Sequence, residues 1–347
     1  MTPSRSRPGT VPGPARPAIL VVGSVALDTV TTPRGKAEDV LGGSASYFSL
    51  VASALTEVRL VGVVGSDFPD ECRVALEAAG VDVGGLTVEE GKTFRWEGVY
   101  GADLVGRRSL RTELNVFETF RPRIPAAFRK TPIVFLANID PDLQAAVLDQ
   151  MESPSRVVLD TMDFWMTGKK KDALVGLLGR VQVVLVDQRE AQLLTDRPRL
   201  ADAVEWIQDR GPRIVVVKRG DCGALARLDD DWFWIPPYPV ADVVDPTGAG
   251  DSFAGGFLGS LARWGDDPAG LRRGLIIGAA AASRAIEGFG ALWMAGVELE
   301  EILERARVIA DMGRLPYPDP VLNERHVVAT APWTGGEAGG PRQDGTH

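Results

Sequence analysis

The stretch "VVDPTGAGDSFAGGF", residues 243 to 257, joins a glycine-rich turn to the start of an amphipathic helix. After Asp251 the large apolar residues recur at helical spacing, which predicts a helix over residues 251 to 264. The three small residues at 248 to 250 leave the backbone open to a ligand, and several N–H groups converge there at the positive end of the helix dipole. The stretch therefore predicts an anion-binding turn with a carboxylate beside it.

Such a turn is suited to phosphoryl transfer. Asp251 can accept the proton of an attacking hydroxyl group while the turn takes up the negative charge that develops on the transferred phosphoryl group. A structural explanation is also open, because aspartate is a preferred N-cap residue and glycine-rich turns often precede helices. The rest of the chain decides between these two interpretations.

Short apolar runs rich in β-branched residues alternate with helix-like stretches along the chain. Continuous apolar strands separated by helices are typical of a parallel sheet that is covered on both faces. We therefore expect an α/β fold, Rossmann-like and doubly wound, with a mostly parallel sheet flanked by helices. The predicted strands are residues 18 to 23, 58 to 65, 132 to 138, 156 to 160, 181 to 186 and 213 to 218, and two of the predicted helices are residues 44 to 55 and 70 to 80.

Residues 92 to 117 depart from this alternation. They alternate polar with apolar or aromatic side chains about a charged turn that contains glycine, which predicts a hairpin. Because a two-stranded hairpin is not stable alone, we expect it to pair with strands near residues 26 to 40 and to form a small β-sheet lid over one end of the main sheet. Closure of this lid would exclude water from a ligand bound beneath it.

The two ends of the chain differ from its centre. Residues 1 to 17 are rich in proline and poor in apolar side chains, so burial cannot offset the entropy lost on ordering them. In the tail over residues 326 to 347, the stretch 331 to 347 is glycine-rich and equally unlikely to fold. We expect a disordered arm, one domain over residues 18 to 325 and a disordered tail.

Composition argues against several classes of function. The net charge is −9, whereas nucleic-acid partners are bound by a surplus of lysine and arginine. We expect no secretory signal and no membrane span, because no segment reaches the roughly 18 apolar residues that a span requires. Two cysteines, Cys72 and Cys222, suit a reducing cytoplasm. With His326 and His347 as the only histidines, Ser-His-Asp hydrolysis and histidine-bound zinc are disfavoured.

The anion-binding turn is similar to a known signature. Residues 245 to 251 read D-P-T-G-A-G-D and resemble the second signature of the ribokinase-like, or PfkB, carbohydrate kinases, approximately D-T-x-G-A-G-D, with Pro246 in place of threonine. The resemblance extends over residues 18 to 315 in the order of elements. It implies a Rossmann-like domain with a β lid, ATP as the phosphoryl donor and Mg²⁺. The catalytic residues that it implies are Asp251 as the base and Gly248, Ala249 and Gly250 as the anion hole.

Two further segments resemble the acceptor site of this family. Asp28 in "GSVALDTV" follows the first strand at its carboxyl end, where ligands collect in open α/β sheets, and a carboxylate can accept two sugar hydroxyl groups at once. Gly42 and Gly43 match the family's di-glycine, which allows lid hinging and close backbone approach. Tyr47 stands where the family usually has an asparagine that contacts the acceptor. A solvated loop aspartate and a helix-entry turn are the structural alternatives.

The nucleotide side of the resemblance is carried by "VDQREAQLL" and "VVVKRGDCGALAR". The first is similar to the family's N-x-x-E element near the phosphates and Mg²⁺, with Glu190 matching and Asp187 in place of asparagine, where it would hold a metal-bound water. Its structural alternative is an acidic first helical turn that favours the helix dipole. The other residues that the resemblance assigns to the nucleotide are Lys218, Gly220, Thr247, Ala280 and Ser283, and a monovalent cation is expected near Asp245.

Other phosphate-binding motifs do not match. The "GKT" at 91 to 93 lacks the first glycine of a Walker A loop, since Leu86 stands there, and no G-x-G-x-x-G follows the first strand. A P-loop enzyme and a dehydrogenase are therefore disfavoured.

The sequence leaves the acceptor open. The family contains sugar kinases and nucleoside kinases, so the resemblance implies transfer of the γ-phosphoryl group to a primary hydroxyl of a small sugar or, alternatively, of a nucleoside. A catalytically idle relative that only binds its ligand is a third interpretation, and a homodimer through the lid is a further expectation. Aromatic side chains that would stack on a base or a sugar, or pack the lid or a dimer interface, are Tyr47, Phe94, Trp96, Tyr100, Phe164 and Trp165.

Overall fold

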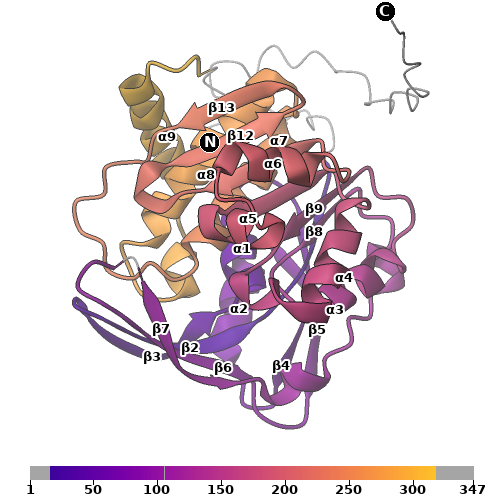
Figure 1. Ribbon diagram of the computed structural model, residues 1–347. Helices are drawn as coiled ribbons and strands as arrows, with labels where there is room; N and C mark the ends of the chain where they lie inside the picture. Colours follow the sequence, from indigo (N-terminus) through magenta and orange to yellow (C-terminus); the bar gives the residue numbers. More distant parts are fainter. Residues whose placement is uncertain (1–15, 105, 318–347) are drawn as a thin grey trace, which may run out of the picture.

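A computed structural model describes residues 16 to 104 and 106 to 317 of the chain (Figure 1). Within them, the centre of the molecule is a nine-stranded sheet. Its strands, in their order across the sheet, are β13 (Asp231–Ile235), β12 (Ala224–Leu228), β11 (Ile214–Lys218), β10 (Val183–Asp187), β9 (Arg156–Asp160), β8 (Ile133–Leu136), β1 (Ile19–Val22), β4 (Val58–Gly65) and β5 (Val81–Glu89).

The sheet is mostly parallel, as the sequence predicts. Every pairing from β5 across to β11 is parallel, and β12 and β13 continue the sheet antiparallel to β11. All six predicted strands are present, with shifts of up to two residues at their ends. The sequence analysis did not predict β5, β12 or β13. Parallel strands end at the same edge of a sheet, so the carboxyl ends of β1 and β8 to β11 share one edge.

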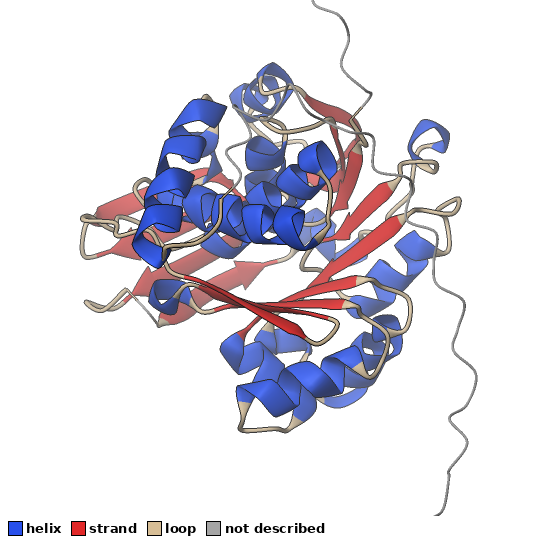
Figure 2. Cartoon of the chain, turned by 90° about the horizontal axis from the view of Figure 1, so that it is seen from above, coloured by secondary structure: helices blue, strands red, loops and turns tan. Residues whose placement is uncertain are grey.

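Side chains alternate between the two faces of the sheet and build two hydrophobic cores. In β1, Ile19 and Val21 point into one core while Leu20 and Val22 point into the other. Helices cover both faces, which makes the fold doubly wound (Figure 2). The first core lies under α1 (Ser44–Ala52), α2 (Asp70–Ala78), α7 (Ala249–Trp264), α8 (Pro268–Ala285) and α9 (Leu299–Gly313), and the second under α3 (Pro141–Leu148), α4 (Gly168–Leu178), α5 (Gln188–Thr195) and α6 (Leu200–Gln208).

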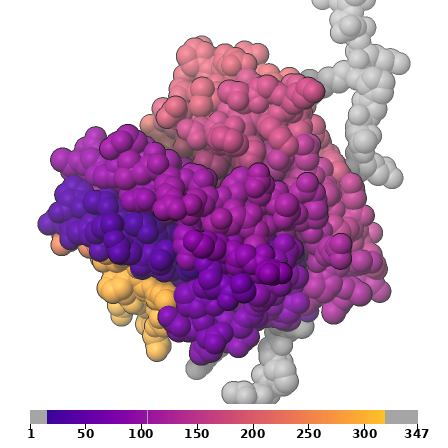
Figure 3. All heavy atoms as spheres, turned by 90° about the horizontal axis from the view of Figure 1, so that it is seen from below, coloured from indigo at the N-terminus to yellow at the C-terminus, as the bar shows by residue number. Residues whose placement is uncertain are grey.

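A second sheet of four strands forms the predicted lid, in the order β3-β2-β6-β7 (Figure 1). Strands β6 and β7 form the predicted hairpin, and β6 pairs in parallel with β2, which itself pairs antiparallel with β3. The bounds are β2 (Ala26–Thr32), β3 (Gly35–Gly42), β6 (Phe94–Tyr100) and β7 (Arg107–Glu113). In the view from below, residues from the first third of the chain, in indigo and purple, form much of the face toward the viewer (Figure 3).

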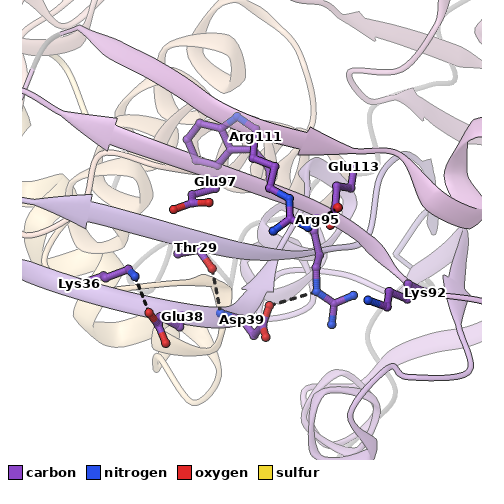
Figure 4. Close-up of a pocket in the computed structure, with 10 residues that line it drawn as sticks. Thr29, Lys36, Glu38, Asp39, Lys92, Arg95, Glu97, Arg111 and Glu113 are labelled. Atoms are coloured by element: carbon purple, nitrogen blue, oxygen red, sulfur yellow. Dashed lines mark hydrogen bonds and ion pairs between the residues drawn. The ribbon is translucent and has the colours of Figure 1, made fainter.

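One face of the lid carries a groove of about 400 Å³ lined by charges of both signs (Figure 4). Ion pairs cross it, among them Arg95 with Asp39 and Lys36 with Glu38. Such a surface is polar and exposed, in contrast to the face that carries Asp28. The charged side chains of the groove are Lys36, Glu38, Asp39, Lys92, Arg95, Glu97, Arg111 and Glu113.

The chain ends are described only in part. Pro17 lies against the main sheet, where its carbonyl accepts a hydrogen bond from Thr56 Oγ1 at 2.9 Å. The rest of the predicted arm, residues 1 to 15, and the predicted tail, with His326 and His347, lie outside the described residues. In the part of the chain that the structure covers, no helix is long and apolar enough to cross a membrane. Neither of the two cysteines is in a disulfide; Cys72 is buried and Cys222 exposed.

Candidate active site

The candidate site lies at the carboxyl edge of the main sheet. Asp160, Asp187 and Lys218 are the last residues of the neighbouring strands β9, β10 and β11. The amino end of α7 and the lid strand β2, which carries Asp28, complete the surroundings.

The anion-binding turn opens α7 two residues earlier than predicted. Helix α7 begins at Ala249, because Gly248 takes a left-handed conformation with φ 74° and serves as its N-cap. No side chain of the described residues caps this end. The first N–H groups of a helix have no partner inside the helix, and such an end can bind an anion. The Ala249 N–H, however, donates to the Pro246 carbonyl at 3.3 Å, so the expected donor role of Ala249 is taken up within the turn. The N–H groups of the neighbouring glycines are the candidate donors to an anion. Asp251 falls in the first turn and does not cap the helix.

Asp251 has the protonation behaviour of a base that works near neutral pH. Burial raises the pKa of this carboxyl group to about 7, and the charge of Asp160 adds to the rise, whereas Lys218 and Arg107 oppose it. A general base is most effective when its pKa lies near the working pH. The carboxylate therefore exists in both protonation states around neutrality.

The di-glycine makes room for Asp28. A Cβ on Gly42 would overlap the Asp28 carboxylate, and a Cβ on Gly43, which has φ 90°, would overlap the carbonyl of Ser24. Asp28 is only 5% exposed, and burial, followed by the charges of Asp245 and Asp251, raises its pKa to about 7. The two glycines thus allow a carboxylate to sit between β2 and the start of α1.

Tyr47 lies against the anion-binding turn. Its ring occupies the space beside Gly248, where any Cβ would overlap it. The hydroxyl group is buried and has no hydrogen-bond partner among the described residues. Burial, together with the charges of Asp28, Asp245 and Asp251, raises the pKa of the phenol well above its usual value. The hydroxyl is therefore a neutral donor close to three carboxylates.

The lid contacts the turn directly. The hydroxyl groups of Tyr100 in β6 and Thr247 lie 3.1 Å apart and share a hydrogen bond. Burial raises the pKa of Tyr100, as it does for Asp28 and Asp251, and the charge of Arg107, opposite Tyr100 in β7, opposes all three increases. The sequence analysis did not select Arg107. It lies in a charged segment of the sequence, and no local pattern there predicts that the lid places its charge near Asp28 and Asp251.

Asp187 and Glu190 form a capping box at the start of α5. The Asp187 N–H donates to Glu190 Oε2 at 2.7 Å, and the Glu190 N–H donates to Asp187 Oδ1 at 2.6 Å. Burial raises the pKa of Glu190 to about 8, with Asp187 and Asp160 adding to the rise and Lys218 opposing it. The two residues therefore stabilise the start of α5, which is the structural alternative considered for this motif. The capping box uses one oxygen of each carboxylate.

Lys218 reaches across the sheet edge to Asp160. Its Nζ lies 3.0 Å and 2.9 Å from the two carboxylate oxygens of Asp160. Lys218 is among the residues predicted from the sequence, whereas Asp160 is not, although it ends a predicted strand at the ligand-binding edge. Its place at the carboxyl end of a parallel strand was the signal from which it could have been predicted as a site residue.

Asp245 is fully buried beneath the turn. Its Oδ1 accepts the Thr247 N–H at 2.9 Å, and its N–H donates to the carbonyl of Ile286 at 3.1 Å. Its Oδ2 has no hydrogen-bond partner among the described residues. An unpaired buried carboxylate oxygen fits a small cation, because a buried charge is costly without a partner.

The remaining predicted nucleotide residues lie on two elements. Gly220 follows β11 with φ 54°, and a Cβ there would meet no atom within 4 Å. Ala280 and Ser283 lie in α8 and are buried. The Ser283 hydroxyl donates to the Ala280 carbonyl at 2.6 Å and accepts from Arg305 at 3.2 Å. Their contact with adenine stays a prediction.

The predicted aromatic residues separate into different environments. Phe94 stacks on Phe117 with ring centroids 5.4 Å apart, at the base of the lid. Phe164 is 69% exposed, and Trp165 donates from Nε1 to Asn138 Oδ1 at 3.0 Å. Trp96 is adjacent to Asp28 in the register of β2 and β6.

Comparison with known proteins identifies the family of the chain. The family model for the pfkB family carbohydrate kinases matches residues 19 to 292. The cytidine kinase of Thermococcus kodakarensis is 31% identical over 251 residues, which cover 71% of this chain and 88% of that protein. The structure of Burkholderia thailandensis nucleoside kinase in complex with inosine aligns with a TM-score of 0.72 at 18% identity, over 86% of this chain and 100% of that one.

An Escherichia coli protein titled Ribokinase II, solved in complex with ATP and Mg²⁺, aligns with a TM-score of 0.70 at 19% identity, over 83% of this chain and 99% of that one. At these identities the two solved structures establish the fold alone. The family match covers most of the chain, and it includes the turn at residues 248 to 250 and Asp251. The chain is therefore a kinase that belongs to the pfkB family of carbohydrate kinases.

Proposed function

We propose that this kinase transfers the γ-phosphoryl group of ATP to the primary hydroxyl group of a ribose-containing acceptor. The observation that carries the proposal is the uncapped amino end of α7 with Asp251 in its first turn and the pKa of that carboxyl group at about 7. ATP as donor is supported by the fold shared with the E. coli protein solved with ATP and Mg²⁺.

In the proposed reaction, Asp28 accepts hydrogen bonds from hydroxyl groups of the acceptor and orients its primary alcohol. The alcohol oxygen forms a bond to the γ-phosphorus, the bond from that phosphorus to the β–γ bridging oxygen breaks, and ADP leaves. Asp251 receives the alcohol proton. Gly248 and Gly250 donate N–H groups to the transferred group, whose loose transition state needs alignment and charge stabilisation more than a strong base.

Magnesium has a suitable place at Asp187 and Glu190. Each carboxylate uses one oxygen in the capping box and keeps the other, and Mg²⁺ is usually held in kinases by one or two carboxylates, waters and substrate phosphates. The ion would supply charge neutralisation on the donor phosphates. A monovalent cation at Asp245 is proposed on the unpaired Oδ2 of that residue.

A nucleoside is the acceptor that we favour. Trp96 and Asp28 are neighbours in the register of the lid, and the Trp96 indole lies over Gly98, where a Cβ would overlap it. Its Nε1 donates to Ser109 at 3.0 Å, which fixes the ring. The ring also lines the charged groove of the lid, so only the strand register relates it to Asp28, and the choice of a nucleoside rests mainly on similarity to a known kinase. The similarity to a cytidine kinase over 88% of its length supports the same acceptor class.

A free sugar is the second candidate, because the same indole can pack against the C–H face of a sugar ring and the family model is that of carbohydrate kinases. The discriminating experiment measures ADP formation from ATP with pyrimidine and purine nucleosides, pentoses, hexoses and ketose phosphates. The proposal expects the highest kcat/KM with a nucleoside. Higher kcat/KM with a free sugar would overturn the nucleoside assignment, and ATP binding without turnover on any acceptor would favour the idle relative.

Assembly and location are separate proposals. We propose a homodimer in which the lids of two copies meet. Because the groove on the lid is lined by charged side chains, an interface that includes it would be polar (Figure 4). Sedimentation at low and high salt tests this, since ion pairs across an exposed interface weaken as salt rises. A cytoplasmic location stays a prediction from the free cysteines.

A further inference from the structure

The Asp160–Lys218 ion pair spans the strand between its two partners. Lys218 ends β11 and Asp160 ends β9, with β10 between them in the sheet. The lysine stem therefore crosses the carboxyl end of β10, and the ammonium meets both oxygens of the carboxylate at 3.0 Å and 2.9 Å. The side chains are 17% and 3% exposed. This is a buried pair at the ligand-binding edge.

Asp160 is held on its own side by backbone contacts. Its Oδ1 accepts the Thr161 N–H at 2.9 Å. Its carbonyl accepts a hydrogen bond at 3.0 Å from the buried amide of Gln144, which also donates to the carbonyl of Ala137 at the end of β8. The carboxylate is thus a fixed acceptor, whereas the four-carbon stem of Lys218 is intrinsically flexible.

The ammonium also borders the anion-binding turn. A Cβ on Gly250 would lie 3.3 Å from Lys218 Nζ, so the bare Cα of this residue faces the charge. A lysine ammonium carries three N–H donors, and within the described part of the chain its two hydrogen-bond acceptors are both oxygens of Asp160. One donor is left for an anion that binds at the turn.

Two other acids compete for the same ammonium. Burial lowers the pKa of Lys218, but the charges of Asp160, Glu190 and Asp251 outweigh this and raise it above its usual value. If the lysine paired with Asp251 it would weaken the proposed base, and if it paired with Glu190 it would occupy a proposed magnesium ligand. A buried ion pair adds little stability after desolvation, so stability alone does not account for Asp160.

We propose that Asp160 is a positioning residue for phosphoryl transfer, which holds the Lys218 ammonium at Gly250 so that Lys218 binds the γ-phosphoryl group of ATP and leaves Asp251 free. This inference rests on the proposed kinase function and adds a cationic phosphate contact to it. The contact stabilises charge on the transferred oxygens, and one such donor is worth about 100-fold or more in rate.

The test compares full-length wild type with Lys218→Met, Lys218→Arg, Asp160→Asn and the double variant Asp160→Asn/Lys218→Met. We expect Lys218→Met to lower kcat about 100-fold with a smaller change in the acceptor KM, and Lys218→Arg to recover part of the loss. Asp160→Asn should lower kcat about 10-fold in wild type and have little effect in the Lys218→Met background, because a residue that acts through another loses its effect when that partner is absent.

The pH profile separates positioning from a general structural defect. The charges that act on Asp251 are Asp160, Lys218 and Arg107. Lys218→Met should therefore move the acid limb of kcat/KM to higher pH, and Asp160→Asn should move it to lower pH. The matched control is Asp229→Asn, which breaks the exposed Arg213–Asp229 pair at the opposite end of β11 and should change neither the limb nor kcat by more than about twofold.

A binding measurement keeps the inference testable without an acceptor. In calorimetric titrations, Lys218→Met should weaken ATP about 10-fold and ADP much less, since only ATP carries the γ-phosphate. Equal affinities in wild type and Lys218→Met would overturn the inference, as would an additive double variant. If Asp160→Asn fails to fold, an equal decrease of kcat in Lys218→Met and Lys218→Arg would overturn the inference. A wild-type protein without turnover on any acceptor would contradict the proposed function, and the ATP and ADP affinities would still decide the role of Lys218.

Discussion

The ring of Tyr47 lies against the Cα of Gly248, which places a phenol from α1 beside the turn that opens α7. No larger residue than glycine fits at 248 while the ring is there. The hydroxyl of the same tyrosine is buried and lacks a hydrogen-bond partner in the described residues. An unpaired buried donor is costly, so we expect a bound substrate to satisfy it.

Tyr47→Phe tests this expectation. Removal of the hydroxyl deletes an unsatisfied group, so the melting temperature should stay unchanged or rise. The acceptor KM should increase about three- to tenfold, the usual worth of one neutral hydrogen bond, while ATP binding stays unchanged. Thermal unfolding and steady-state kinetics measure the two effects. An unchanged acceptor KM would show that the hydroxyl does not contact the acceptor.

Asp251→Asn should lower kcat by about two to four orders of magnitude, the usual contribution of a general base. The side chain keeps its size, so ATP affinity should stay within about threefold of wild type. Turnover comes from a coupled ADP assay and affinity from calorimetry. Near-wild-type turnover would refute the assignment of Asp251 as the base.

The ligand-free protein should be less stable at pH 8 than at pH 5. The pKa values of Asp28 and Asp251 are raised from 3.8 to about 7 and that of Glu190 from 4.5 to about 8. At pH values between the unfolded and the folded pKa, the folded state binds more protons than the unfolded state. The contribution of these groups to the free energy of unfolding is therefore highest below pH 4 to 5, and it is lost as the pH rises through 7 and 8.

Urea denaturation at pH 5, 6, 7 and 8 measures this slope. The variant Asp28→Asn should have a shallower slope, because one of the three groups no longer titrates. A stability that rises steadily from pH 5 to 8, with the same slope in the variant, would show that these carboxyl groups are already ionised in the folded protein.

Gly42→Ala should abolish acceptor binding while ATP binding persists. The added Cβ overlaps the Asp28 carboxylate, so the carboxylate must turn away from its place in the site. Gly176→Ala is the matched control, because a Cβ on this exposed residue of α4 meets no atom within 4 Å. The control should keep full activity and gain up to about 1 kcal/mol of stability from its better helix propensity. Equal acceptor KM values in wild type and Gly42→Ala would remove Asp28 from the acceptor site.

The sequence predicted the architecture from local patterns. The apolar runs predicted the parallel strands, and the alternation over residues 92 to 117 predicted the lid hairpin, because both patterns are properties of consecutive residues. The same reasoning identified the turn and Asp251. Helix α7 nevertheless begins at Ala249, since the left-handed conformation of Gly248 allows the helix to start before the aspartate.

The parts that were missed depend on contacts between distant segments. Asp160 matters because a lysine two strands away reaches it, and Arg107 matters because the lid folds over the sheet. Neither relation leaves a pattern among neighbouring residues. For Asp187 and Glu190 the capping interpretation is realised in the structure, and their role with magnesium stays a prediction.

The hydrogen bond between Tyr100 and Thr247 joins the small β-sheet, which is proposed to cover the acceptor, to the turn that is proposed to bind the phosphate of ATP. Thr247 adjoins the turn proposed to receive the phosphate, while Tyr100 belongs to the small sheet that is proposed to close over the acceptor. Occupancy of either side therefore biases the same contact. By thermodynamic linkage, the factor by which bound ATP changes the affinity for the acceptor equals the factor by which bound acceptor changes the affinity for ATP. The two ligands should therefore bind with reciprocal cooperativity of equal size.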